Sequence, residues 1–432
     1  MTAGAWRMTP AIQMAVIVGL AIAAVGALTS RVDVVLLALP LLASAAIGFD
    51  AQPRPGEGGM HVDVTRRSGP GGVSEFGYAV AIEAPARTEL VHVRIAPQGS
   101  RVRDLVLTPM GAASITGRLP VVHSGRQVVV EVSYRLIGVD GGWLSPAAPW
   151  RAAEHVIDPA IAVVASVPLP QRLSGLTGSH LSARLGDGGE FRDLHPYAPG
   201  DRLRRIDWKA TARRSQGFGD PYVRRTGAMS DATIVLVLDS RDDVGERIES
   251  WSIERDTSAG LSSMDLAREA AASLAVAAIG GGDRVSLIDL AVHDGLVTAG
   301  SGKRHLDRLL RRIAVSGPIG FRPNRRRAPI VPAGAIVYLF SPFLDDDVTA
   351  IAKLWRAAGH RVVAIDVLPA PLLDGSGRHT RIVHRLMMAE RRLRIADARA
   401  SGIEMLRWQE GADQPSRSVA LRTIARAGQR RR

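Results

Sequence analysis

Two uncharged apolar runs dominate the first fifty residues of the chain. Residues 11–29 (AIQMAVIVGLAIAAVGALT) and 34–49 (VVLLALPLLASAAIGF) contain no charged side chain, and only four residues separate them. A helix needs about 20 apolar residues to cross a bilayer, within a range of about 17–25. The first run meets this length and the second reaches it with its flanks. The pattern therefore predicts a transmembrane hairpin over residues 1–50.

Two alternatives compete with the hairpin: a signal peptide with Arg7 as its charged n-region, and a buried helical hairpin of a soluble domain. We prefer the transmembrane hairpin because the second run follows so soon and no convincing small-residue cleavage site precedes it. A hairpin leaves both of its ends on one side of the membrane. Arg7 precedes it, and Arg54, Arg66 and Arg67 follow it. The positive-inside rule then predicts a cell-membrane protein with residues 50–432 in the cytoplasm.

A Pro/Gly linker at 51–59 leads into a region with a period of two residues. Apolar and polar positions alternate clearly in 90–96 and 128–138 and more weakly in 78–84, and turn clusters separate these runs. Short alternating strands at near-regular spacing predict an all-β, sandwich-like domain over residues 60–165. We expect a structural role for it, because its His, Asp and Glu residues do not cluster at metal-ligand spacing.

Residues 231–432 alternate between apolar strands and helices. The run 232–239 (ATIVLVLD) is apolar almost throughout, as expected for a strand buried on both faces. The alternation predicts a Rossmann-type α/β domain, a parallel sheet with helices on both faces. Further strands are expected at 284–292, 334–341, 360–368 and 403–408, and helices at 264–279, 303–314, 346–359, 384–402 and, as a basic tail, 419–432.

Composition narrows the available chemistry. The chain has no cysteine, which excludes disulfides, thiolate metal ligands and thiol nucleophiles. The formal net charge is +13 and comes almost entirely from arginine. Codon bias in a GC-rich genome is one explanation, and attraction to an anionic surface is the other. The apolar hairpin favours the lipid bilayer as that surface, and nucleic acid is not expected.

The segment 166–230 joins the two folded regions, and its stretch 186–213 reads GDGGEFRDLHPYAPGDRLRRIDWKATAR. Two prolines and a glycine predict an ordered turn in HPYAPGD, and a short helix is expected to start in RIDWKATARR. One interpretation is an internal clasp with Phe191, Tyr197 and Trp208 as buried anchors. The other is a partner-binding surface, since Arg, Trp and Tyr dominate binding hot spots.

An enzymatic role for this segment would use His195, Asp201 and Asp207 as acid–base groups. Such a role also needs a nucleophile or a metal, and the neighbouring sequence offers neither. We therefore expect a protein that is not an enzyme.

The same stretch resembles the signature of the bacterial family called domain of unknown function 58, or DUF58. The family pattern is roughly G-x-E-F-x-x-L-R-x-Y-x-P-G-D-x-x-R-x-I-D-W-K-x-x-A-R. This chain departs from it at His195, where the family usually has Arg. The resemblance implies a partner-binding or structural role for the matching residues, which are Gly188, Glu190, Phe191, Tyr197, Pro199, Gly200, Asp201, Arg204 or Arg205, Ile206, Asp207, Trp208, Lys209, Ala212 and Arg213. The order of hairpin, β region, signature and α/β domain fits as well.

The α/β domain resembles a von Willebrand factor type A domain. The first strand of such domains often ends in D-x-S-x-S, whose oxygens help to hold Mg²⁺ at a metal-ion-dependent adhesion site. Here Asp239 matches, whereas Arg241 and Asp243 replace the two serines. Pro342 stands where a later aspartate is expected. These departures indicate a degenerate site, so Mg²⁺ is disfavoured and no cofactor is expected.

The DUF58 resemblance also implies a partner, because relatives are commonly associated with MoxR-type AAA+ ATPases. They are thought to help these ATPases assemble or remodel protein complexes. The function expected is that of a non-enzymatic, membrane-anchored adaptor. The alternatives are a metal-dependent adhesion-type protein or hydrolase that uses the type A loops, and a basic scaffold at anionic lipid or nucleic acid.

Overall fold

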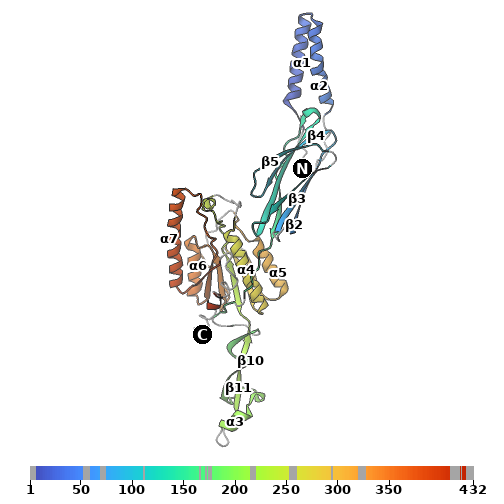
Figure 1. Ribbon diagram of the computed structural model, residues 1–432. Coiled ribbons are helices and arrows are strands. Elements are labelled where there is room, and N and C mark those ends of the chain that lie inside the picture. The colour runs from blue at the N-terminus through green and yellow to red at the C-terminus, as the bar shows by residue number, and fades with distance from the viewer. Residues whose placement is uncertain are drawn as a thin grey trace. The chain divides into compact units, whose positions relative to one another are not determined.

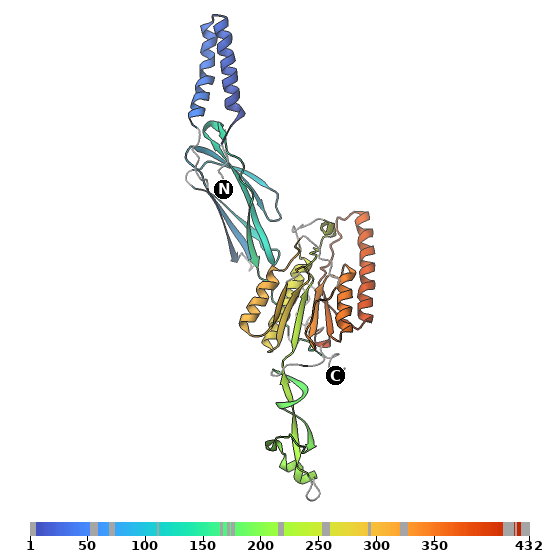
Figure 2. The ribbon, with the colours of Figure 1, turned by 180° about the vertical axis from the view of Figure 1, so that it is seen from behind.

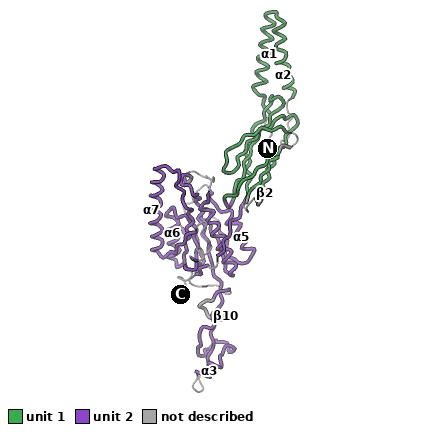
Figure 3. The backbone as a smooth tube through the Cα atoms, viewed as in Figure 1, with its two compact units in different colours: residues 1–122, 126–155, 256–258 green, residues 123–125, 156–255, 259–432 purple. Residues whose placement is uncertain are grey.

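The computed structural model of the protein divides into two compact units (Figure 3), one of residues 1–122, 126–155 and 256–258 and the other of residues 123–125, 156–255 and 259–432. It describes the chain outside residues 1–5, 52–58, 69–73, 110–111, 165–166, 171–172, 174–177, 215–219, 253–259, 293–294, 320–326, 409–418, 420 and 425–432. Side chains are described for all other residues except 67–68, 74, 112–113, 181–190, 250 and 252. Most of the expected linker at 51–59 and much of the expected tail helix at 419–432 thus lie outside the described residues.

The first unit begins with two apolar helices, α1 (Pro10–Leu28) and α2 (Val32–Asp50), drawn in blue in Figure 1. Both are long and apolar enough to cross a membrane, as the sequence predicted. Small residues set their close approach: a Cβ on Gly19 would lie 2.8 Å from Leu42 Cδ2. Most of their apolar side chains are exposed, Leu28 and Leu37 among them. This exposure argues against the buried hairpin of a soluble domain.

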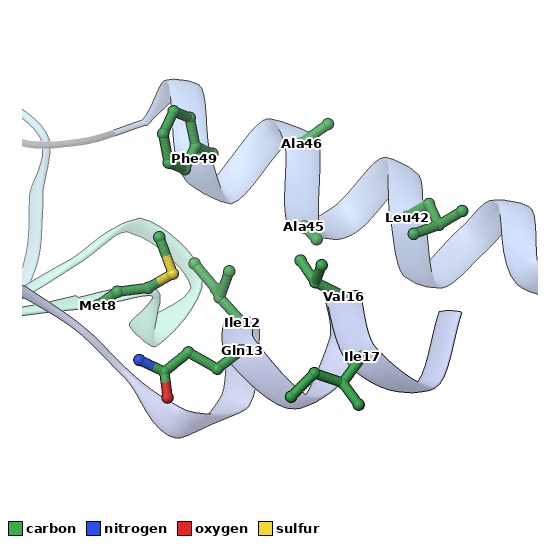
Figure 4. Close-up of a pocket in the computed structure, with 9 residues that line it drawn as sticks. All are labelled: Met8, Ile12, Gln13, Val16, Ile17, Leu42, Ala45, Ala46 and Phe49. Atoms are coloured by element: carbon green, nitrogen blue, oxygen red, sulfur yellow. The ribbon is translucent and has the colours of Figure 1, made fainter. Parts of the chain in front are cut away.

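An apolar groove runs between the two helices near their ends (Figure 4). Only Gln13 contributes a polar side chain to its walls. The remaining lining residues are Met8, Ile12, Val16, Ile17, Leu42, Ala45, Ala46 and Phe49. The groove therefore continues the apolar surface of the helix pair.

Two antiparallel sheets complete the first unit. One has the order β2-β3-β6, and the other has the order β1-β8-β7-β4-β5 with β9 also paired to β7. Both contribute to a single hydrophobic core, in which Val80 of β3 packs with Val93 of β4 and Val132 of β7. The period-two pattern is confirmed, since alternate residues of β4 are buried. The strands are β1 (Arg7–Met8), β2 (Gly59–Ser68), β3 (Ser74–Glu83), β4 (Thr88–Pro97), β5 (Arg103–Leu107), β6 (Ala112–Pro120), β7 (Gly125–Gly138), β8 (Trp143–Leu144) and β9 (Arg151–Ile157).

Trp143 ties the helix pair to these sheets. Its indole N–H donates a hydrogen bond of 2.8 Å to the carbonyl of Gly48 near the end of α2. Its ring lies 6.3 Å from the ring of Phe49. The strand β1, which leads into α1, pairs with β8 so that Met8 lies opposite Trp143. Both ends of the helix pair are thus fixed to the same sheet.

The second unit contains a six-stranded sheet in the order β14-β13-β12-β15-β16-β17, seen from both sides in Figures 1 and 2. Its strands are β12 (Thr233–Leu238), β13 (Arg284–Asp289), β14 (Leu296–Gly300), β15 (Ile336–Ser341), β16 (Arg361–Asp366) and β17 (Glu404–Arg407). Five of them are parallel, and β14 pairs antiparallel at one edge. The expectation of a purely parallel sheet is therefore corrected. The short β14 escaped notice because its five residues are exposed or half-buried, with none fully buried, and they lack a long apolar run.

Four long helices cover the two faces of this sheet. Alternate residues of β12 enter two separate cores, so that Leu236 packs on one face and Val237 on the other. The first core includes α4 (Ser263–Gly280) and α5 (Lys303–Val315). The second includes α6 (Asp346–Ala357) and α7 (Arg378–Ala400). The predicted layers are confirmed, although α7 begins six residues earlier than expected.

Asp265 fixes the start of α4. Its carboxylate accepts a hydrogen bond from the backbone N–H of Ser262, whose hydroxyl in turn accepts from the N–H of Asp265, a capping box. His123 and Ser124, which belong to the same unit, also donate to this carboxylate. Burial by itself raises the pKa of Asp265, but the hydrogen bond and charge of His123, the charge of Arg268 and the N–H of Ser124 together lower it by more than burial raises it. The net result is a pKa below the ordinary value.

We expect the contribution of Asp265 to stability to be lost in acid. A carboxyl with a lowered pKa in the folded state stabilises that state above its unfolded pKa, near 3.8, and loses this effect as the pH falls through the folded value. In thermal unfolding of the full chain in detergent, the melting temperature of Asp265→Asn should lie well below that of the wild type at pH 6. The difference between the two melting temperatures should shrink as the pH approaches 3. Asp307→Asn, an exposed acid on α5, serves as the control and should show little gap at either pH.

Candidate functional site

Polar side chains end each central strand of the sheet at its carboxyl edge. Asp239 follows β12, while Asp289, Ser341 and Asp366 are the last residues of β13, β15 and β16. The strand order reverses between β12 and β15, because β12 is followed by β13 on one side and β15 lies on the other. Doubly wound sheets bind their ligands outside such a reversal point. Asp239 and Ser341 lie at that point, so it is the natural candidate site of this fold.

The guanidinium of Arg241 fills this site from within the chain. Its side chain is only 2% exposed. Its Nε donates to Asp239 Oδ1 at 2.7 Å, and its Nη2 and Nη1 lie 3.0 Å from Asp345 Oδ2 and 3.3 Å from Asp347 Oδ2. Burial by itself lowers the pKa of Arg241, but its hydrogen bonds and charge interactions with Asp239 and Asp345 raise it above the ordinary value. Arg241 is therefore a permanent cation among three carboxylates.

The residues at this position do not fit a bound Mg²⁺. Asp239 accepts from Arg241 and, at 2.6 Å, from the hydroxyl of Ser341. Asp243 turns away to the start of α4, where it accepts from the N–H of Met264 at 3.0 Å. The carbonyl of Pro342 accepts from Nε of Arg391 at 2.7 Å. Across the part of the chain that the structure describes, no group of three or more His, Asp or Glu residues is arranged to hold a metal ion.

Loss of the Arg241 side chain should destabilise the second unit strongly. Arg241→Ala leaves Asp239 buried beside Asp345 without their shared cation, and breaking a buried ion pair in this way costs about 3–5 kcal/mol. We expect a lowered melting temperature for the full chain in detergent. Arg308→Ala, which removes an exposed arginine of α5, should melt close to the wild type. Equal melting of the two variants would show that the Arg241 contacts do not stabilise the fold.

The signature segment forms a separate structural feature, a two-stranded antiparallel arm that we define as residues 180–230. Its strands are β10 (His180–Pro196) and β11 (Tyr222–Ser230), with several register shifts between them. At its base, His180 Nε2 lies 2.9 Å from Asp283 Oδ1, and only two residues separate β11 from β12. The arm thus starts at the amino end of β12 (Figure 1). Since β12 has six residues, about 20 Å separates this base from the Arg241 site at about 3.3 Å per residue.

Some signature residues build the tip of the arm, which we define as residues 197–214 and 220–222. The carboxylate of Asp201 accepts from the N–H of Ala198 at 3.0 Å, across a turn in which Gly200 has a φ of +104°. The carboxylate of Asp207 accepts from the N–H of Ala210 at 2.9 Å. This bond caps the predicted short helix, now observed as α3 (Trp208–Arg214) after a 3-10 turn at Leu203–Arg205. These aspartates therefore fix the backbone.

Other signature residues point into solvent. Trp208 is 69% exposed, and Phe191 is 49% exposed beneath the guanidinium of Arg224 at 5.4 Å. The interpretation of these two residues as buried anchors is therefore wrong, while Tyr197 is half-buried. Leu203, 68% exposed, was missed by sequence reasoning, although an isolated leucine in DRLRR was a usable signal. Pro199, Lys209 and Arg213 are exposed, Arg205 is half-buried, and the side chain of Glu190 lies outside the described residues.

The chain thus combines a two-stranded arm with a sheet edge at which Arg241 pairs with three carboxylates. Comparison with known proteins agrees with the signature. Residues 193–370 match the family described as "Protein of unknown function DUF58". The chain is 33% identical over 214 residues to "Uncharacterized protein Mb1516" of Mycobacterium bovis and to "Uncharacterized protein Rv1480" of Mycobacterium tuberculosis. The match covers 46% of this chain and 61% of each relative. No solved structure matches the chain.

Proposed function

We propose that this protein is a non-enzymatic, membrane-anchored adaptor whose arm binds a partner protein. The observation that carries the proposal is the exposure of Trp208 and Leu203 on a tip whose backbone is fixed by Asp201 and Asp207. A large exposed aromatic on a preorganised backbone loses little conformational freedom when it binds. Trp is also among the residues that contribute most at binding hot spots.

The charge of the arm selects the chemistry of the partner. Residues 180–230 contain ten Arg or Lys and six Asp or Glu, a net charge of +4. A cationic surface around exposed apolar groups is complementary to an acidic surface that surrounds an apolar pocket. The DUF58 resemblance suggests a MoxR-type AAA+ ATPase as the partner, and remodelling of protein complexes as the shared task. In this proposal the arm is the site at which the ATPase binds the membrane-anchored chain.

The proposal includes a von Willebrand factor type A-like fold for the α/β unit. Its support is the mixed sheet with one antiparallel edge strand and Asp239 at the reversal point. In this proposal Arg241 replaces the metal of the adhesion-type site, so that partner binding does not need divalent cations. Binding at the arm is then separate from the position that would hold a metal in a type A domain.

Truncation of the exposed tip side chains should weaken partner capture without unfolding the protein. We expect Trp208→Ala and Leu203→Ser to recover about tenfold less AAA+ ATPase from detergent-solubilised membranes. Their melting temperatures should match the wild type because the removed atoms face solvent. Trp150→Ala is the matched control, since Trp150 is an exposed tryptophan of the first unit that stacks with Arg94.

Two results would count against this proposal. Wild-type protein that captures no AAA+ ATPase, in the presence of ATP or without it, would remove the proposed partner. Equal capture by wild type and both tip variants would place the binding surface elsewhere than on the arm.

The proposed topology places both ends of the helix pair in the cytoplasm. The absence of cysteine allows single labelling sites, and Thr29→Cys in the turn between α1 and α2 can be compared with Ala212→Cys on α3. In intact cells a membrane-impermeant maleimide should label Thr29→Cys. It should label Ala212→Cys only after the membrane is opened. The reverse pattern would invert the topology, and labelling of both in intact cells would contradict a spanning hairpin.

A further inference from the structure

Helix α7 docks on its own domain through an unusual face. Its buried residues are His384, Arg391 and Ala398, spaced by seven, with Ile395 packed beside them. Arg391 forms an ion pair with Asp366 and also donates to the carbonyl of Pro342. Polar contacts of Arg391 therefore take part in the docking beside the apolar Ala398 and Ile395. A surface helix ordinarily turns its apolar stripe towards the core, but the longest apolar stripe of α7 lies elsewhere.

That apolar stripe faces solvent on the opposite side of the helix. Ile382, Leu386 and Leu393 are 41%, 62% and 72% exposed. Together with three alanines they form a regular series at positions 382, 386, 389, 393, 396 and 400. The spacings of four and three alternate throughout, which is the a/d repeat of a coiled coil. With Leu386 and Leu393 at a, the buried residues His384, Arg391 and Ala398 fall at f, the position farthest from the seam.

The charges beside the stripe are complementary to those of a second copy of the same helix. Arg385 and Arg392 occupy the g positions, and Glu390 and Asp397 occupy the e positions. In a parallel coiled coil, each g residue meets the e residue five positions later on the other helix. Arg385 of one copy would then meet Glu390 of a second copy, and Arg392 would meet Asp397. An antiparallel pair would bring arginine to arginine and carboxylate to carboxylate.

The five-residue spacing has no use within a single helix. Side chains interact along one helix at separations of three or four residues. In the chain itself Glu390 lies 3.7 Å from Arg394, and Asp397 pairs with Lys353. Both carboxylates are more than half exposed, and such surface pairs contribute little, so they can exchange partners. The g and e charges therefore match a second copy of α7 better than any contact within the chain.

We propose that α7 is a homodimerisation surface, through which two copies of this chain associate as a parallel, in-register coiled coil. Half of the seam consists of alanine, so the helices pack closely but bury limited area, and the dimer is weak in dilute solution. Two copies anchored in one membrane meet at a high effective concentration, which compensates for a weak interface. The inference does not depend on the arm or on its partner.

A single cysteine tests the register directly because the natural chain has none. Ala396→Cys places a thiol at a d position, where a parallel in-register pair brings residue 396 of both copies together. Full-length protein in lipid vesicles should form a covalent dimer with a short thiol cross-linker. Ala350→Cys, an exposed alanine of α6, should remain a monomer under the same conditions. Equal cross-linking of both variants, or of neither, would overturn the proposal.

Charge exchange separates specific pairing from general loss of structure. One variant carries Arg385→Glu and Arg392→Glu, and the other carries Glu390→Arg and Asp397→Arg, each together with Ala396→Cys. The first is then acidic at all four positions and the second basic at all four. Each alone should lose the cross-linked dimer, and a mixture of the two in one vesicle should restore it as a heterodimer. Cross-linking that survives in either variant alone would show that these charges do not direct association.

Discussion

The ion cluster around Arg241 is the constraint on which the α/β unit depends. A doubly wound sheet collects polar strand ends at its reversal point, and here three carboxylates gather there. A cation is needed to offset their mutual repulsion. The guanidinium of Arg241, which follows β12, is that cation and is part of the chain itself. This cation cannot dissociate, exchange or respond to ion concentration. Arg241 therefore occupies the position that often binds ligands in such sheets, which is why the proposed partner binding is assigned to the arm.

The arm shows how one sequence signature serves two purposes. Asp201, Gly200 and Asp207 set a turn and a helix start through backbone hydrogen bonds and a positive φ. The fixed backbone then presents Trp208 and Leu203 to solvent. A signature of this length therefore does not consist only of contact residues. Substitution of the aspartates would disturb the backbone of the tip, whereas substitution of the exposed residues would leave that backbone intact and change only the surface that we propose for partner binding.

Much of the fold follows from hydrophobic periodicity, and the failures have a physical cause. Continuous apolar runs revealed β12, β13, β15 and β16, and period two revealed β3, β4 and β7 of the first unit, because burial on two faces or on one leaves these patterns. The edge strand β14 has no fully buried residue and leaves no such pattern. Sequence also identified Arg241 as a departure from a metal motif. It could not reveal that Asp345 and Asp347, about a hundred residues away, would complete the ion cluster, since that depends on strand order.

The exposure of Phe191 and Trp208 was beyond sequence reasoning for a different reason. An aromatic in a charged segment reads equally well as a buried anchor or as an exposed contact, and only the tertiary packing distinguishes them. The same ambiguity affects α7, whose apolar residues look like an ordinary core-facing stripe until the docked face is known. Arg391 reverses that expectation, because its contacts with Asp366 and Pro342 turn the f positions inward. A polar anchor on one side of a helix thus frees the apolar side for a second molecule.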